Sequence, residues 1–178
     1  MLTAPLATAE DLRDAAAFAA LMWAMARPGT QHDLPRGMAD LALALVDLEC
    51  LVMTDDPALA GVIAATGAAL VPADRADHAF YLDADGVLPV LAALPAGSAL
   101  YPDRGATLVV AAQLDRGARL RLTGPGIDGA CTVRVGGLPA GFFAARAARC
   151  RYPEGIDIVL VDGRRLMALP RSTGVEEL

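Results

Sequence analysis

Glycines in the stretch RLRLTGPGIDG, residues 119–129, have the G-x-G-x-x-G spacing of a dinucleotide-binding turn. Such a turn holds a pyrophosphate only where a strand precedes it and a helix begins on it, because backbone N–H groups and the helix N-terminus bind the phosphates. Residues 119–123 can form the strand, but residues 130–135 (ACTVRV) alternate as a second strand would. No Asp or Glu lies between Asp128 and Glu154 to bind a ribose. The pattern therefore predicts a turn between two strands.

Two histidines and three cysteines are the other side chains that often act as nucleophiles, bases or metal ligands: His32, His78, Cys50, Cys131 and Cys150. Neither histidine belongs to a motif such as H-E-x-x-H. The cysteines are odd in number and widely spaced, which fits neither a disulfide framework nor a zinc or iron–sulfur ligand set. We interpret the cysteines as small core residues.

Two acidic stretches could in principle bind a divalent metal or form an acid–base pair: residues 83–86 (DADG) and 54–57 (TDDP). The first is typical of a turn after a strand. The second is typical of a helix start, because Asp56 can cap the helix and Pro57 fits its first turn. These patterns predict no metal site and no catalytic residue.

Lysine is absent, and all fifteen basic residues are arginine. A Schiff base with pyridoxal phosphate and a Walker A phosphate site both need a lysine side chain, so both classes of enzyme are excluded. We expect no cofactor.

Charge is divided unevenly along the chain. Residues 1–103 hold 4 Arg and 14 acids, a net charge of −10, whereas residues 104–178 hold 11 Arg and 7 acids, a net charge of +4. The basic half could face an anionic ligand or an acidic partner, or its arginines could simply be solvated. The overall charge of −6 and the 4% of aromatic residues argue against nucleic-acid binding.

The length of 178 residues fits one domain, residues 1–178, that can bury a sizeable core. No apolar run reaches the roughly 20 residues that span a bilayer, so we expect no membrane contact. The N-terminal stretch MLTAPLATAEDLRD lacks the basic flank and apolar segment of a signal peptide. These features predict a cytoplasmic protein.

Helical patterns cover about residues 9–26, 38–48, 57–67, 87–94 and 138–149. Thr8 and Asp11 resemble a capping box for the first helix. An apolar face of that helix is predicted to pack on the core, with Trp23 beside it; its residues are Phe18, Leu21, Met22 and Met25.

Strand patterns cover about residues 50–53, 68–71, 79–82, 106–112, 119–123, 130–135, 156–161 and 165–169. Turns are predicted at Arg116-Gly117 and Asp162-Gly163. Because helices alternate with strands before a strand-rich region, we predict a three-layer α/β/α fold with a mixed central sheet.

Four stretches, taken in order and spacing, resemble the PhnH family, a subunit of the bacterial carbon-phosphorus lyase core complex of phosphonate metabolism. They are FAALMWAMARPGT (18–30), YPDRGATLVV (101–110), LRLTGPGI (120–127) and YPEGIDIVLVDGRRLMALPRST (152–173). The resemblance covers about residues 15–177. It implies a fold similar to pyridoxal-phosphate-dependent transferases, without the lysine that binds the cofactor.

The resemblance further implies an accessory, non-catalytic subunit in alkylphosphonate catabolism, with PhnG, PhnI and PhnJ as partners and a homodimer when isolated. Breaking a C-P bond by radical chemistry needs a cysteine-held iron–sulfur cluster, which would lie in a partner. The alternative is a stand-alone enzyme on a small phosphorylated substrate, with arginines clamping the phosphate and a carboxylate such as Asp157 as base.

Positions that match the family motifs are the candidate site residues. Arg27, Arg104, Asp157 and Arg171 are candidates for an anion-binding or subunit-docking site, or for salt bridges within the fold. Pro28, Gly29, Gly124 and Gly126 are candidates for structural turns. The chain departs from the family at Ala19, where members often carry Arg, and at Gly174, where some members carry His.

Overall fold

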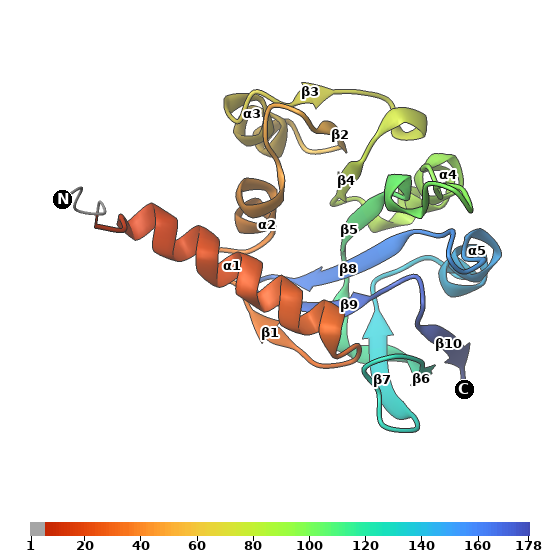
Figure 1. Ribbon diagram of the computed structural model, residues 1–178. Coiled ribbons are helices and arrows are strands. Elements are labelled where there is room, and N and C mark those ends of the chain that lie inside the picture. The colour runs from red at the N-terminus through yellow and green to blue at the C-terminus, as the bar shows by residue number, and fades with distance from the viewer. Residues whose placement is uncertain (1–5) are drawn as a thin grey trace.

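A seven-stranded sheet forms the centre of the computed structural model, which describes residues 6–178 (Figure 1). Its strand order is β1 (His32–Asp33), β9 (Arg165–Leu169), β8 (Asp157–Asp162), β5 (Thr107–Ala111), β4 (His78–Tyr81), β2 (Leu51–Thr54) and β3 (Ala69–Leu70). Strands β3, β2, β4, β5 and β8 are parallel, and β9 runs antiparallel to β8 and β1. The prediction of a mixed sheet in an α/β fold is confirmed.

Helices cover both faces of this sheet (Figure 1). They are α1 (Ala9–Ala26), α2 (Met38–Leu45), α3 (Pro57–Ala65), α4 (Val87–Ala93) and α5 (Phe142–Arg149), with short 3-10 turns η1 (Ala73–Arg75), η2 (Ala84–Gly86) and η3 (Pro102–Arg104). Successive residues of β5 point to opposite faces: Val109 packs with α1, α2 and α3, whereas Leu108 and Val110 pack with α4 and α5. Burial on both faces explains the unbroken apolar run in this strand.

Local capping fixes where the first and third helices begin. The Asp11 backbone N–H donates to Thr8 Oγ1 at 3.1 Å, and the Thr8 N–H donates to Asp11 Oδ2 at 2.8 Å, so the predicted capping box is confirmed. At α3, Asp56 Oδ1 accepts from the Ala58 N–H at 2.8 Å, with Pro57 in the first turn.

The predicted buried face of α1 is wrong in part. Leu21 is buried, but Phe18 and Met22 are about half exposed, as is Trp23. The helix instead packs through its small residues, which let its backbone lie close to α2 and β9; these are Ala17, Ala20 and Ala24. Close packing on alanines leaves Phe18, Met22 and Trp23 on the outer side of the helix.

A second, antiparallel sheet of three strands lies beside the first, in the order β10 (Gly174–Glu177), β6 (Gln113–Thr123), β7 (Cys131–Gly136). The turn predicted at Arg116-Gly117 is wrong: β6 continues through it, and Leu114 and Ala118 both pair with Val135 across a bulge. The sequence patterns also missed β1 and β10, which are short strands at sheet edges. The helix predicted from residue 138 begins only at Phe142, and the one predicted to end at residue 48 ends at Leu45.

None of the helices in residues 6–178 is both long and apolar enough to cross a bilayer.

Candidate functional site

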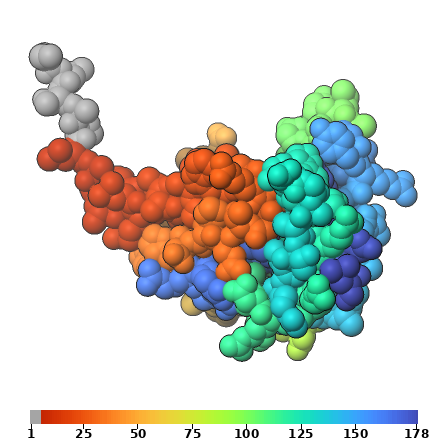
Figure 2. Space-filling model, turned by 90° about the horizontal axis from the view of Figure 1, so that it is seen from below, coloured from red at the N-terminus to blue at the C-terminus, as the bar shows by residue number. Residues whose placement is uncertain are grey.

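The turn between β6 and β7 lies between two segments that are distant in the sequence. Gly126 has φ +82°, and a Cβ there would lie 2.2 Å from the Ala26 carbonyl oxygen at the end of α1. Gly124 has φ +130°, and a Cβ there would lie 2.8 Å from the Ser172 carbonyl oxygen. Figure 2 shows the end of α1 beside this hairpin. The two glycines therefore serve close backbone packing, and β7 rather than a helix follows the turn, as predicted.

The end of α1 is held against the same hairpin. Pro28 is buried, and Gly29 has φ +90° with its Cα close to β7: a Cβ there would lie 2.8 Å from Cys131 Sγ. The stretch ARPG thus joins α1 to the small sheet.

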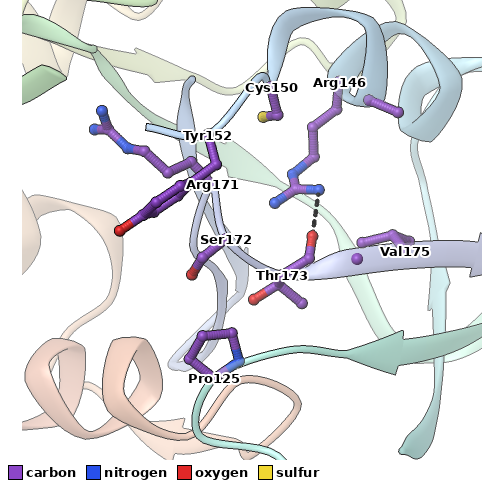
Figure 3. Close-up of a pocket in the computed structure, with 10 residues that line it drawn as sticks. Pro125, Arg146, Cys150, Tyr152, Arg171, Ser172, Thr173 and Val175 are labelled. Carbon is purple, nitrogen blue, oxygen red and sulfur yellow. Dashed lines mark hydrogen bonds between the residues drawn. The ribbon is translucent and has the colours of Figure 1, made fainter. Parts of the chain in front are cut away.

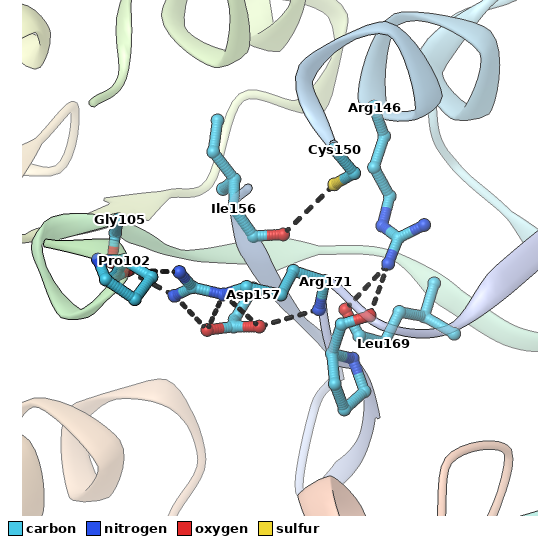
Figure 4. A network of polar contacts seen from close by, with 9 residues as sticks. Pro102, Gly105, Arg146, Cys150, Ile156, Asp157, Leu169 and Arg171 are labelled. Carbon is cyan, nitrogen blue, oxygen red and sulfur yellow. Dashed lines mark hydrogen bonds and ion pairs between the residues drawn. The ribbon is translucent and has the colours of Figure 1, made fainter. Parts of the chain in front are cut away.

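Arg171 and Asp157 form an internal ion pair, with Arg171 Nη2 2.6 Å from Asp157 Oδ2 (Figure 4). The Arg171 backbone N–H also donates to Asp157 Oδ1 at 2.7 Å, and the guanidinium donates to the carbonyls of Pro102 and Gly105. Both side chains are mostly buried, at 17% and 14% exposure. The pair connects β8, the segment after β9 and η3. Its two charges therefore compensate each other within the fold.

Arg104 and Arg27 are both exposed. Arg104 stands in η3, next to the carbonyls that Arg171 binds, and its guanidinium lies over the Tyr101 ring at 4.7 Å. Arg27 follows α1 and lies over the Trp23 ring at 4.9 Å. Among residues 6–178 neither has an ion-pair partner. The structure thus brings Arg104, Asp157 and Arg171 into one region and keeps Arg27 at the end of α1.

A cavity of about 560 Å³ opens between α5 and the segment that leads into β10 (Figure 3). Its lining residues are Pro125, Arg146, Ala147, Cys150, Tyr152, Arg171, Ser172, Thr173, Gly174 and Val175. The cavity adjoins the motif segments LTGPGI and PRST, so it lies where the family-like stretches meet.

Arg146, at the wall of this cavity, is a functional candidate that the sequence patterns missed. The residue is only 2% exposed, and its guanidinium donates to the carbonyls of Thr173 at 3.0 Å, Leu169 at 3.2 Å and Pro170. Burial lowers the pKa of Arg146, an effect that Cys150 and Asp157 oppose. Nothing in the stretch FFAARAAR distinguishes this arginine from Arg149, because only the packing of α5 shows which one is buried.

The cysteines lie apart from one another. All three are free and partly buried, so the prediction of core positions holds only in part. Desolvation raises the pKa of Cys50 and of Cys131, which keeps both thiols protonated at neutral pH. Within residues 6–178, no three Cys, His, Asp or Glu side chains lie together as metal ligands would.

The outer face of α1 is apolar from residue 15 to residue 26. Its exposed members are Ala15, Ala16, Phe18, Ala19, Met22, Trp23 and Ala26. Glu10 and Asp11 stand at the start of the helix and Arg27 directly after its end, which leaves an apolar stripe between opposite charges. Apolar surface of this kind marks protein interfaces.

Known proteins resemble the chain over nearly its whole length. A family model described as "Bacterial phosphonate metabolism protein (PhnH)" matches residues 8–176. A protein named as the C-P lyase subunit HtxG, from Stutzerimonas stutzeri, is 32% identical over 176 residues, covering 92% of this chain and 86% of the relative. The protein named alpha-D-ribose 1-methylphosphonate 5-triphosphate synthase subunit PhnH, from Rhizobium meliloti (strain 1021), is 33% identical over 177 residues, covering 89% and 88%. From the matching stretches and the geometry that joins them, we conclude that the chain belongs to the PhnH family of bacterial phosphonate metabolism proteins.

Proposed function

We propose that this chain is an accessory, non-catalytic subunit of the carbon-phosphorus lyase core complex in alkylphosphonate catabolism. The observation that carries the proposal is the match over residues 8–176 to a phosphonate metabolism family, in which two relatives are named as enzyme subunits. The partners we propose are PhnG, PhnI and PhnJ, which would supply the chemistry. The complex would work in the cytoplasm.

The alternative of a stand-alone enzyme with Asp157 as general base has less support. Both carboxylate oxygens of Asp157 accept hydrogen bonds from Arg171, which favours a structural role for this carboxylate. A base must reach a substrate proton, and this carboxylate is already occupied.

The exposed face of α1 is the surface that we assign to docking within the complex, with Arg27 at one end. Arg104 is a second exposed cation available to a partner. Asp157 and Arg171 support the position of Arg104 indirectly, because Arg171 binds carbonyls in and beside η3, which carries Arg104. A partner with an apolar groove and an acidic rim would complement α1 and Arg27.

Deletion of the gene tests the functional proposal. A deletion strain is expected not to grow on methylphosphonate as sole phosphorus source and to recover when the gene is restored. Normal growth of the deletion strain, with no second gene copy present, would refute it.

Co-purification tests the docking surface. Arg27→Glu is expected to weaken recovery of tagged PhnG, PhnI and PhnJ, because it reverses a charge at the interface. Arg75→Glu, an exposed arginine in η1, is the matched control and should leave recovery unchanged. Equal recovery with both variants would remove Arg27 from the docking surface while leaving membership of the complex intact.

We also propose that the sheet is similar to that of pyridoxal-phosphate-dependent transferases and that this chain does not bind their cofactor. Because no lysine is present, pyridoxal phosphate is expected to form no borohydride-trappable aldimine at any side chain of the purified protein. Absorbance titration followed by peptide mapping measures this; reaction at the N-terminal amine is excluded by the map. A saturable adduct within the fold would contradict the expectation.

A further inference from the structure

The cavity between α5 and residues 171–175 lies apart from the docking surface on α1, and it shares only Arg171 with the ion pair. Its volume of about 560 Å³ lies within the range of small-molecule sites. Figure 3 shows Arg146 reaching from α5 toward Thr173, with Ser172 and Pro125 on the opposite side. The cavity is therefore large enough for a small ligand and is bordered by hydrogen-bonding groups.

The charge at the wall of the cavity is uncompensated. Arg146 is only 2% exposed, yet no carboxylate in residues 6–178 lies within ion-pair distance of it. Asp157, which favours the charged form of Arg146 from a distance, is already paired with Arg171. A buried cation is normally paired, because removal from water disfavours its charge. An anion in the cavity would supply the missing partner.

Unused hydrogen-bond donors accompany that charge. The guanidinium of Arg146 has five N–H groups, of which three donate to backbone carbonyls. Its Nε is buried without a partner, and so is the hydroxyl of Thr173 on the facing segment. Buried donors without acceptors are uncommon, so two of them at one cavity point to an absent acceptor.

The remaining lining sets the kind of anion. The cavity has two arginines and no acidic residue in its lining, and its walls include Pro125, Ala147 and Val175. An anion with a short apolar substituent satisfies both parts: its oxygens face the donors and its substituent contacts the apolar walls.

We propose that this cavity binds a small organic oxyanion, with its oxygens held by Arg146 and Thr173 and its apolar substituent against Ala147 and Val175. Phosphonates and carboxylates share this chemistry, and the experiment below separates them. The proposal does not depend on membership of the complex, because binding is measured on the isolated chain.

Calorimetric titration of the full chain with ethylphosphonate, inorganic phosphate and propionate tests it. We expect saturable binding of an ethyl-bearing oxyanion, tighter than that of inorganic phosphate because phosphate lacks the apolar substituent. Arg146→Gln should weaken binding about tenfold or more, and Thr173→Val several-fold. Arg149→Gln is the matched control: Arg149 lies on the same helix, does not line the cavity and donates to the Leu94 carbonyl.

Two-dimensional amide NMR locates the site independently of the variants. The proposal predicts that the amide chemical shifts of Ala147, Gly174 and Val175 in the unaltered protein change as ligand is added. This measurement does not depend on whether Arg146→Gln folds. Thr173→Val keeps a second test available, because the Thr173 hydroxyl makes no hydrogen bond whose loss would unfold the protein. Absence of saturable binding for all three anions, or binding that Thr173→Val and Arg149→Gln leave equally unchanged, overturns the proposal.

Discussion

Arginine side chains in this protein have different roles because their surroundings differ. Arg171 is paired with Asp157, Arg146 is buried on backbone carbonyls, and Arg27 lies exposed over Trp23. The same side chain therefore serves as a structural tie, as a wall of a cavity and as a surface charge. Which task each performs depends on the neighbours that the fold supplies.

Replacing Asp157 tests the structural tie. Asp157→Asn removes the negative charge and leaves the guanidinium of Arg171 mostly buried without a counterion, so we expect a loss of about 3 kcal/mol in the free energy of unfolding. Asp128→Asn is the control, because Asp128 is exposed on the hairpin. Urea unfolding followed by circular dichroism measures both. Equal stability of the two variants would show that the pair contributes little.

His78 predicts a pH dependence of stability. Burial lowers its pKa in the folded state, against the opposing effect of Asp77 and Asp47, and its Nδ1 is buried without a partner. Below about pH 6.5 the unfolded chain therefore binds a proton that the folded protein resists. The contribution of His78 is present above that pH, and the free energy of unfolding falls as pH decreases below it.

Denaturant titrations between pH 5 and pH 8, an estimated window around the ordinary histidine pKa, measure this dependence. His78→Gln should flatten the slope below about pH 6.5. His32→Gln removes the other histidine, so a slope that is lost in His78→Gln and kept in His32→Gln assigns the dependence to His78. A slope unchanged by His78→Gln would assign it to other groups.

The position of the β6–β7 turn is fixed by backbone contacts more than by side-chain contacts. It lies against the end of α1 at Gly126 and against the segment after β9 at Gly124. The stretch LTGPGI, which covers the end of β6 and the start of the turn, thereby holds together strands and a helix from three parts of the chain. Its tolerance to substitution should follow these contacts.

Gly126→Ala and Gly129→Ala form a matched pair on the same hairpin. Both positions have positive φ, +82° and +67°, but a Cβ at Gly126 would lie 2.2 Å from the Ala26 carbonyl oxygen, whereas at Gly129 nothing lies within 4 Å. Both variants lose stability from backbone strain, and Gly126→Ala should lose about 2 kcal/mol more because the backbone must move. Thermal unfolding compares them; equal losses would mean that α1 shifts at little cost.

The molecule as a whole presents one long apolar helix face to solvent. α1 runs along one side of the fold and extends beyond the sheet (Figure 1). An antiparallel pair of α1 helices from two copies would bring Glu10 and Asp11 of one copy toward Arg27 of the other. That charge pattern favours two-fold self-association when no other subunit is present.

Light scattering on the purified chain is expected to show a dimer at about 50 µM, a concentration chosen for interfaces of moderate affinity. Trp23→Glu should shift the protein toward monomer, because it places a charge in the apolar face. Leu70→Glu changes a similarly exposed apolar residue on edge strand β3 and should leave the dimer intact. A monomeric parent protein, or equal dissociation by both variants, would contradict this interface.

Residue patterns along the chain determined the class of fold, most elements and the turn character of the glycine motif. Capping at Thr8 and Asp56, the apolar run of β5 and the hairpin at Asp162-Gly163 are local features, and the chain encodes them within a few residues. The absence of lysine likewise follows from composition alone. The family resemblance was equally visible, because its four stretches keep their order and spacing.

Only the tertiary structure decided which side chains of those elements are buried and which are free. Phe18, Met22 and Trp23 of α1 face outward because alanines fit the helix against its neighbours, and hydrophobic periodicity does not distinguish these two faces. Arg146 and Arg149 look alike in the sequence, yet one lines the cavity. Arg171 and Asp157 are paired because β8 and β9 lie side by side. Such contacts join residues distant along the chain, so local sequence patterns carry no record of them.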